Sequence, residues 1–297
     1  MVEGKILITA LYDLISSEEN GLKINDVIEK IDGQNVNDII KQRGRYLNGS
    51  NLVTKLRQSD LLLFSGQNDS VRLTINRNGN SIEKVVKRYT SENMQYAAKP
   101  KLTWEIKPNN IGYINMGLLT IKETRDVMNQ LKQTKSIIFD LRNYPKGTFM
   151  VLPTYLFSEP RSFAKLIAPD PDYPGKFYWK KEFPKGSKNN DAYNGKLIVL
   201  VNEQTQSQAE WTAMVIQSVP GTVTIGSQTA GADGDVSTLE FPNGSKIYMT
   251  GLGVFYPDGT ETQRKGIKID IEIKPTILGI QQGKDEVLEK ALEIAKQ

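Results

Sequence analysis

Ser207 occupies a position where the sequence predicts that a strand ends and a helix begins, and such a position can activate a serine hydroxyl. The segment Leu197–Val201 is continuously apolar, as expected for a strand buried on both faces. A helical pattern then runs over 207–218 and is ended by Pro220 and Gly221. The unpaired amides and positive dipole end of such a helix would stabilise an oxyanion beside the hydroxyl. Ser207 is therefore a candidate nucleophile.

The same segment also fits a purely structural role. Ser207-Gln208-Ala209-Glu210 has the spacing of a capping box, in which the serine and glutamate side chains bind each other's backbone amides. The chain contains no histidine, so it lacks the commonest general base. Taken alone, this segment favours helix capping, and a catalytic interpretation needs support from other parts of the chain.

Two further segments carry residues that can shape a site. The apolar strand 137–141 is followed by the turn 142–147, which can aim backbone amides at a ligand, and Asp140 is expected to pair with Arg142 and hold it. The loop 226–234 is spaced by glycines. Because the end of one strand and the helix start after another meet at the edge where open α/β sheets bind ligands, we expect the turn 142–147 to lie beside Ser207.

The composition excludes several other classes of protein. The 38 basic and 34 acidic residues give a net charge of +4, and the lysines are spread along the chain, so no nucleic-acid partner is predicted. The absence of cysteine excludes disulfides and thiolate metal sites. Asp233 and Asp235 fall short of the roughly six oxygens that calcium prefers, so neither a metal nor a cofactor is predicted. No stretch reaches the roughly 18 apolar residues of a membrane span.

The chain is expected to contain two domains joined by a linker. Residues 1–92 suggest a small α/β module with a strand at 5–11, a helical insertion and a hairpin over 71–86 that is closed by Asn78-Gly79. Residues 93–110 contain two prolines without sustained periodicity, as in a linker. Residues 111–297 alternate strands and helices in the β-α-β manner of a layered sheet. The elements expected there are strands 111–116, 136–141 and 196–201 and helices 122–133, 207–218 and 284–296.

The segment 157–194 has no helical or strand period and is rich in proline, lysine and aromatic residues. Loops of this length are usually functional or disordered. Its aromatic residues over 177–183 favour a loop that faces the substrate.

Residues 21–36, with the sequence GLKINDVIEKIDGQNV, resemble PDZ domains. In that family a glycine-leucine turn leads into an apolar strand pair that ends at an Asp-Gly turn. A small strand-turn-strand unit of another kind could carry the same spacing. The resemblance predicts a PDZ-like domain over 1–92 that binds an extended peptide tail by strand addition.

Three motifs of the second domain together resemble one family. Asp-Leu-Arg-Asn-x-Pro-x-Gly (140–147), Asn-x-x-Thr-x-Ser-x-x-Glu (202–210) and Gly-x-x-Thr-x-Gly (226–231) occur in this order in the C-terminal processing (tail-specific) peptidases and the related tricorn core proteases. The resemblance implies an α/β (α+β) fold, in which a PDZ-like domain precedes a layered β-α-β peptidase core with a mixed sheet of the ClpP/crotonase type. It implies no cofactor.

The family's functional positions carry over only in part. The resemblance implies that Ser207 is the nucleophile, that the Gln208 amide forms one arm of the oxyanion hole, and that the Gly147 amide forms the second arm. In the processing peptidases a lysine follows the glycine of the third motif and acts as the base, but this chain has Ala232 there. A Ser-Lys dyad of that form is therefore absent.

The tricorn-like branch implies a different base. There a histidine from a segment before the PDZ domain takes the serine proton, helped by a distant glutamate, and the base would then lie upstream of this chain. The nearest candidate acid is Glu261, although the family glutamate aligns nearer Gln263. Lys246 and Lys265 are weaker candidates for a base, because charged side chains are rarely buried.

The leading prediction is a serine peptidase that cleaves polypeptides through an acyl-enzyme, with C-terminal tails as the implied substrates. The resemblance implies a bacterial cell-envelope or periplasmic location, although 1–14 lacks a signal-peptide pattern. A non-catalytic peptide-binding protein that has lost its base is the alternative. Ala232 and the missing histidine favour this alternative, whereas the intact serine elbow and oxyanion turn favour the enzyme.

Overall fold

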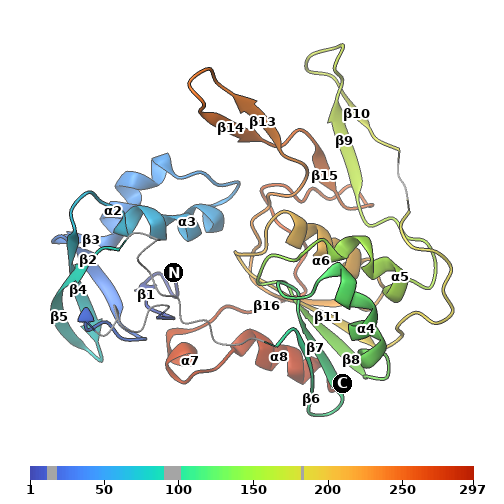
Figure 1. Cartoon of the computed structure of the whole chain (residues 1–297), viewed down its shortest axis with the longest axis horizontal. Coiled ribbons are helices and arrows are strands. Elements are labelled where there is room, and N and C mark those ends of the chain that lie inside the picture. The colour runs from blue at the N-terminus through green and yellow to red at the C-terminus, as the bar shows by residue number, and fades with distance from the viewer. Residues whose placement is uncertain (12–18, 90–101, 182–183) are drawn as a thin grey trace. The chain divides into compact units, whose positions relative to one another are not determined.

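The computed structural model describes residues 1–11, 19–89, 102–181 and 184–297, and the chain divides into two compact units (Figure 1). One unit comprises Met1–Lys101 together with Lys274–Glu289, and the other comprises Leu102–Ile273 together with Lys290–Gln297. The chain therefore passes from the first unit to the second, back to the first, and again to the second.

The first unit is built on an antiparallel sheet of order β1-β2-β4-β5, in which β3 also pairs with β2. The expected hairpin is confirmed: β4 and β5 pair along their whole length across Asn78 and Gly79, whose φ angles are 52° and 86°. Both values are positive, as the common two-residue hairpin turn requires. The elements are β1 (Ile6–Leu7), β2 (Val27–Ile31), β3 (Gln34–Asn35), α2 (Val36–Arg43), η1 (Gly44–Tyr46), α3 (Leu52–Phe64), β4 (Ser70–Arg77), β5 (Asn80–Lys87) and α7 (Ile277–Gln281).

The second unit is built on a mixed six-stranded sheet of order β16-β12-β11-β8-β7-β6, in which β6 and β7 are antiparallel and the other pairs are parallel. Its strands are β6 (Trp104–Lys107), β7 (Ile111–Asn115), β8 (Ser136–Asp140), β11 (Lys196–Val201), β12 (Val223–Gly226) and β16 (Ile271–Glu272). Its helices are α4 (Ile121–Leu131), η3 (Thr148–Met150), α5 (Leu152–Leu156) and α6 (Gln208–Gln217). The expected α/β class with a mixed sheet is confirmed.

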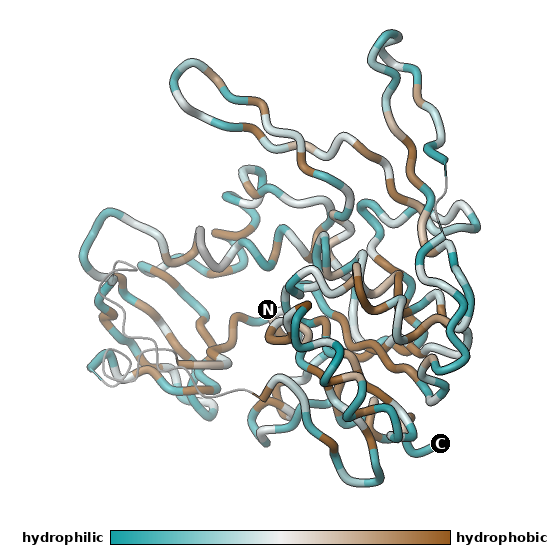
Figure 2. Tube along the Cα trace, turned by 45° about the vertical axis from the view of Figure 1, so that its right-hand side comes forward, coloured by the Kyte–Doolittle hydropathy of each residue, from teal (hydrophilic) through white to brown (hydrophobic). Residues whose placement is uncertain are grey.

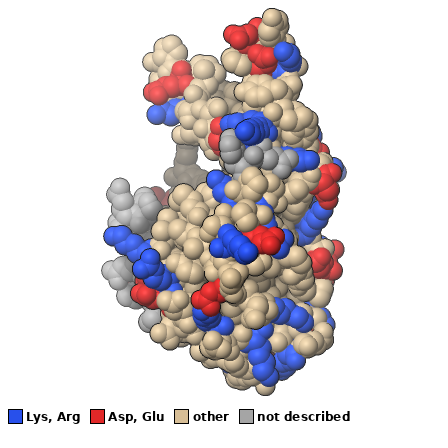
Figure 3. Space-filling view, turned by 90° about the vertical axis from the view of Figure 1, so that its right-hand side faces the viewer, with Lys and Arg blue, Asp and Glu red and all other residues tan. Residues whose placement is uncertain are grey.

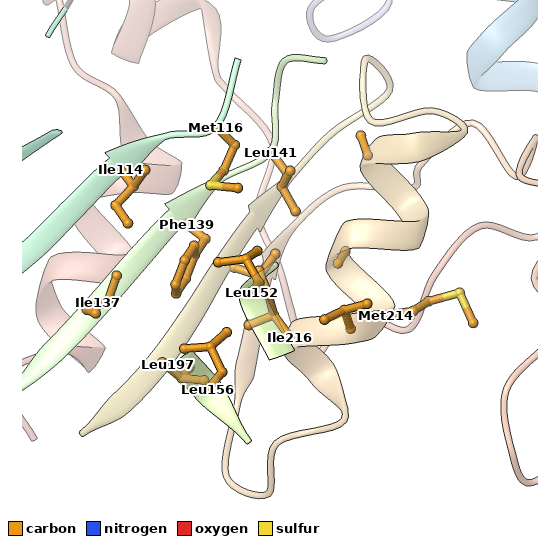
Figure 4. Close-up of a cluster of buried hydrophobic side chains, with 14 of the residues drawn as sticks. Ile114, Met116, Ile137, Phe139, Leu141, Leu152, Leu156, Leu197, Met214 and Ile216 are labelled. Carbon is orange, nitrogen blue, oxygen red and sulfur yellow. The ribbon is translucent and has the colours of Figure 1, made fainter. Parts of the chain in front are cut away.

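The core of the second unit explains why these strands read as continuous apolar runs. Alternate side chains of a strand point to opposite faces, and Phe139 and Leu197 join one cluster with residues of α4, α5 and α6. Figure 4 shows Phe139 and Leu197 on the sheet facing Leu156 and Ile216 on the helices. Ile198 points to the other face and is also fully buried, so the centre of the sheet is covered on both sides. Figure 2 shows the same pattern, with apolar stretches along the central strands.

Two expectations about irregular segments are wrong. Trp104–Lys107 was expected in a linker, but it forms β6 and pairs with β7 across Asn109 and Asn110, which both have positive φ. The segment 157–194 was expected to lack strands, but it contains β9 (Lys165–Pro169) and β10 (Phe177–Trp179). β9 pairs with β10 and with the distant β15 (Gly253–Phe255). Pairing with a strand far along the chain leaves no signal in the local sequence.

Three more elements complete the described chain. Hairpin β13–β14 (Ser237–Glu240 and Lys246–Met249) is exposed on every residue of both strands. Helix α8 (Glu286–Ile294) confirms the expected C-terminal helix, with Val287 and Ala291 buried. None of the helices in the described ranges is long and apolar enough to cross a membrane.

Gly226 lies at the end of the β11–β12 pair, next to the turn that carries Ser207. It ends β12 opposite Val201, has a φ of 144°, and a Cβ at this position would lie 1.8 Å from the Val201 carbonyl oxygen. We expect Gly226→Ala to lower the free energy of unfolding by about 3 kcal/mol, because it adds backbone strain to a steric clash. Urea denaturation followed by circular dichroism measures the change.

Gly221→Ala is the matched control for this substitution. Gly221 also has a positive φ, 81°, but a Cβ there would meet nothing within 4 Å. The free energy of unfolding of Gly221→Ala should therefore fall by only about 1 kcal/mol, from backbone strain alone. Equal losses in the two variants would contradict the steric explanation.

Candidate active site

Ser207 lies between β11 and α6, as predicted, and its backbone is strained. Its φ of 54° and ψ of −117° fall outside the regions that non-glycine residues normally occupy. Strain of this kind persists only where surrounding contacts enforce it, and it is concentrated at functional sites. A nucleophilic serine on a sharp strand-to-helix turn is one known form of such strain. The backbone of Ser207 therefore supports more than a capping role.

Buried Thr205 brings the three motifs together. Its hydroxyl donates to the Leu141 carbonyl at 2.8 Å, which ties the turn before Ser207 to the end of β8. Its carbonyl accepts from the Ala230 amide at 3.0 Å, which ties the same turn to the loop 226–234. The end of β8 therefore lies beside the Ser207 turn, as expected, and the loop 226–234 contacts the same turn.

Glu210 is the centre of the hydrogen-bond network behind Ser207. Its fully buried carboxylate accepts from the Ser207 amide at 3.2 Å, which is the glutamate half of the predicted capping box. It also accepts from the Thr229 hydroxyl at 2.5 Å, the Gly231 amide at 2.6 Å and the Ala232 amide at 2.9 Å. Burial raises the pKa of Glu210, while these four donors favour its charged form. One side chain thus holds the loop 226–234 against the start of α6.

Asp233 is buried beside this network. Its side chain is 1% exposed, and neither carboxylate oxygen has a hydrogen-bond partner among the described residues. Burial, together with the nearby Glu210 charge, raises the pKa of Asp233 to about 7. Asp233 was considered above only as part of a metal turn, and the residues that the structure describes contain no cluster able to hold a metal ion.

The turn 142–147 is held as the sequence suggested. Asp140 accepts from Arg142 through two guanidinium nitrogens, at 3.0 and 2.7 Å, and from the Tyr113 hydroxyl at 2.9 Å. Gly147 follows with a φ of 75°, and its amide donates to Oε1 of the Gln208 side chain. The structure therefore brings Gly147 and Gln208, the two predicted oxyanion residues, into contact next to Ser207.

Glu261 is not in contact with these residues. Its carboxylate forms ion pairs with Arg264 at 3.3 Å and Lys265 at 3.4 Å, both on the same turn, and these bonds lower its pKa. Gln263 donates to the carbonyls of Asp233 at 3.0 Å and Leu252 at 2.8 Å. The position nearest the family glutamate is thus occupied by a structural bridge.

The two lysines considered as bases are both exposed. Lys246 lies on hairpin β13–β14 and pairs with Glu240, and the Lys265 ammonium pairs with Glu261. Neither ammonium group is desolvated, as a buried lysine acting as a base would have to be. Ala232 contributes its amide to Glu210 and has no side-chain base to offer.

A pocket of about 280 Å³ lies further along α6, away from Ser207. It is lined by Met214 and Gln217 and by the Tyr256 ring, whose hydroxyl donates to Gln217 at 2.6 Å. None of the residues predicted for the active site lines this pocket. On the face shown in Figure 3, basic and acidic side chains are interspersed over most of the surface, and a group of basic side chains lies near its lower right edge. This distribution agrees with the spread of lysines along the sequence.

The comparisons with known proteins are consistent with this geometry. The family model for peptidase family S41 matches residues 110–273, which is more than half of the chain. The carboxy-terminal processing protease CtpA of Bacillus subtilis (strain 168) is 27% identical over 282 residues, covering 91% of this chain and 53% of that protein. A probable CtpA-like serine protease of Staphylococcus haemolyticus (strain JCSC1435) is 25% identical over 286 residues, covering 91% and 50%. The chain spans about half the length of these curated relatives.

Solved structures show the same fold. Mature CPAF complexed with lactacystin aligns with a TM-score of 0.74 at 15% identity, over 99% of this chain and 80% of that one. The photosystem II D1 C-terminal processing protease aligns with a TM-score of 0.51 at 16% identity, over 99% and 73%. The resemblance inferred from three short motifs is thereby confirmed, and the chain belongs to peptidase family S41.

Proposed function

We propose that this chain is the core of a serine peptidase in which Ser207 attacks the carbonyl carbon of a peptide bond. The hydroxyl proton passes to a base, the amine product leaves with a proton, and water then hydrolyses the acyl-enzyme. The observation that carries the proposal is the strained Ser207 backbone at the junction of β11 and α6, inside the segment that matches the family model. Helix capping alone does not require such a conformation.

The oxyanion would be stabilised by the backbone amides of Gln208 and Gly147. The Gln208 amide lies in the first turn of α6, where helix amides lack intrahelical acceptors. The Gly147 amide points at the side chain of the residue that follows Ser207. Two such amides beside a serine would supply the donors that a tetrahedral intermediate needs.

The base is proposed to come from outside the described residues. The chain has no histidine, Ala232 stands at the family lysine position, and neither Lys246 nor Lys265 is buried. The tricorn-like arrangement, with an upstream histidine, therefore fits these residues better than a Ser-Lys dyad. The role of distant acid stays a prediction for Glu261, and its ion pairs within its own turn do not favour it.

The proposed substrates are polypeptides, and the finer proposal is that C-terminal tails are preferred. The first unit is proposed to be PDZ-like and to add an extended tail to its antiparallel sheet. Apolar substrate residues would contact hairpin β9–β10, where Phe177 and Trp179 are 57% and 55% exposed. We also propose a cell-envelope location, on the basis of the resemblance to processing peptidases.

Fluorophosphonate labelling followed by peptide mass spectrometry tests the proposed nucleophile. We expect one adduct, on Ser207, and none in Ser207→Ala, while Ser218→Ala, at the far end of the same helix, should label like the parent chain. Loss of the base commonly slows such chemistry by about 10²–10⁴-fold, so the full-length protein should label faster than this chain. Cleavage of an unstructured polypeptide should likewise be faster with the full-length protein than with this chain, and absent in Ser207→Ala.

The opposite results would favour the alternative function. A full-length protein whose Ser207 neither reacts nor cleaves, yet which binds peptides, would be a peptide-binding relative without catalysis. Family membership and the Ser207 backbone favour the peptidase over this alternative.

A further inference from the structure

The Gln208 side chain lies where a substrate carbonyl is needed. Its Oε1 accepts the hydrogen bond of the Gly147 amide, which is the proposed second arm of the oxyanion hole. The two residues are 61 positions apart in the sequence, so the contact joins the turn after β8 to the start of α6. It does not arise from local geometry within either segment.

The chemistry of the contact resembles that of substrate binding. A glutamine side chain ends in a carboxamide, whose oxygen is the same kind of acceptor as a peptide carbonyl. The Gly147 amide can satisfy one such acceptor at a time in a well-formed hydrogen bond. A scissile carbonyl that binds to this amide must therefore displace Gln208 Oε1.

We propose that the Gln208 side chain occupies the oxyanion site of the resting enzyme and must turn away before a peptide carbonyl can bind. This inference rests on the proposed function. It gives Gln208 two opposed roles: its main-chain amide stabilises the oxyanion, and its side chain competes with the substrate. Gln208 is thus a residue that gates access to the proposed reaction.

The surroundings of Gln208 allow the side chain to move without the main chain. Its carbonyl accepts from the Thr212 hydroxyl at 2.7 Å, which anchors the first turn of α6. The side chain is only partly buried, so it has solvent into which it can turn. Release of Oε1 therefore leaves the main-chain amide in place, ready to donate to the substrate.

The strength of a single hydrogen bond sets the size of the effect. The net stabilisation from one neutral amide–carbonyl hydrogen bond corresponds to about a fivefold preference for the state in which Gln208 Oε1 is bound to the Gly147 amide. Removal of the acceptor should then raise the rate of acylation by about three- to tenfold. A bond that instead held the turn in its active position would give the opposite sign, because its loss would slow acylation.

The test compares the second-order rate of fluorophosphonate labelling at Ser207 in a series of full-length variants. Gln208→Met keeps a side chain of similar length without a strong acceptor, and Gln208→Ala removes the side chain, while both retain the main-chain amide. Gln208→Glu places a carboxylate at the same site, where the helix start and the Gly147 amide both stabilise an anion. Gln204→Ala, in the exposed turn before Ser207, is the control.

We expect Gln208→Met and Gln208→Ala to label about three- to tenfold faster than the wild type and Gln208→Glu to label more slowly at neutral pH. Lowering the pH through the range of a carboxyl group should bring the labelling rate of Gln208→Glu back toward that of the wild type measured at the same pH. The ¹⁵N–¹H NMR signal of Gly147 should also shift in Gln208→Met, whether or not Ser207 reacts. Gln204→Ala should match the wild type in both measurements.

Two results would overturn the inference, and they differ from failure of the proposed function. Unchanged or slower labelling in both Gln208→Met and Gln208→Ala, with Ser207 still reactive, would show that the contact does not compete with substrate. An unchanged Gly147 signal would show that the contact is absent in solution. If Ser207 fails to react in every variant, the peptidase proposal itself is wrong, and the gating role is wrong with it.

Discussion

Replacement of Glu210 by alanine is expected to lower the free energy of unfolding by about 4 kcal/mol, because several buried donors lose their acceptor at about 1–3 kcal/mol each. The amides of Ser207, Gly231 and Ala232 and the Thr229 hydroxyl all donate to this one carboxylate. Their loss should also release the loop 226–234 from the start of α6. Urea denaturation followed by circular dichroism measures the stability of the variant.

Glu159→Gln is the control, because Glu159 is exposed and its replacement should change stability by less than about 0.5 kcal/mol. Glu210→Gln tests the network without a cavity. One end of its amide would present N–H groups to backbone amides that are themselves donors, so Ser207 labelling should fall even if the variant folds. A Glu210→Ala protein as stable as the Glu159→Gln control would contradict the central role of Glu210.

Asp233→Asn is expected to remove a pH-dependent loss of unfolding free energy that reaches up to about 4 kcal/mol in the wild type, since one pKa unit corresponds to about 1.4 kcal/mol. Burial and the Glu210 charge raise the pKa of Asp233 from 3.8 to about 7 in the folded protein. Between these two values the unfolded chain has released a proton that the folded protein still holds. The free energy of unfolding of the wild type should therefore fall as the pH rises from about 4 to about 7. Above that range the full cost of holding a charged, buried Asp233 should remain.

The quantity to compare is the difference in the free energy of unfolding between Asp233→Asn and the wild type at each pH. This difference should move in favour of the variant as the pH rises from about 4 to about 8. Asp235→Asn, two residues away and exposed, should leave the curve of the wild type unchanged. If the Asp233→Asn and Asp235→Asn curves have the same shape, Asp233 is not the titrating group.

The elements that could be predicted from the sequence are those with strong local signals. Lys196–Val201 is a strand with the expected bounds, because a strand buried on both faces reads as an unbroken apolar run. Helix α6 begins one residue after Ser207 and ends at Gln217, close to the expected stop before Pro220. The Asn78-Gly79 turn and the Asp140–Arg142 pair were also predicted, since both depend on residues close together in the chain.

The missed features depend on contacts between distant residues. β9 is stabilised by pairing with β15, and no pattern within 157–194 reveals that partner. Glu210 could be predicted only as a capping residue, because three of its four donors lie about twenty positions later, in the loop 226–234. The burial of Asp233 near the Glu210 charge is likewise a property of the packed structure.

The path of the chain between the two units limits how the protein can be cut. Lys274–Glu289 belongs to the first unit although Leu102–Ile273 precedes it, and Lys290–Gln297 returns to the second. A gene fragment that stops at Ile273 would therefore remove part of both units, and no single breakpoint yields either one whole. Recombination that exchanges the first unit for another must join at two or more points. The two units are thus expected to be inherited, and to be expressed for experiments, as one piece.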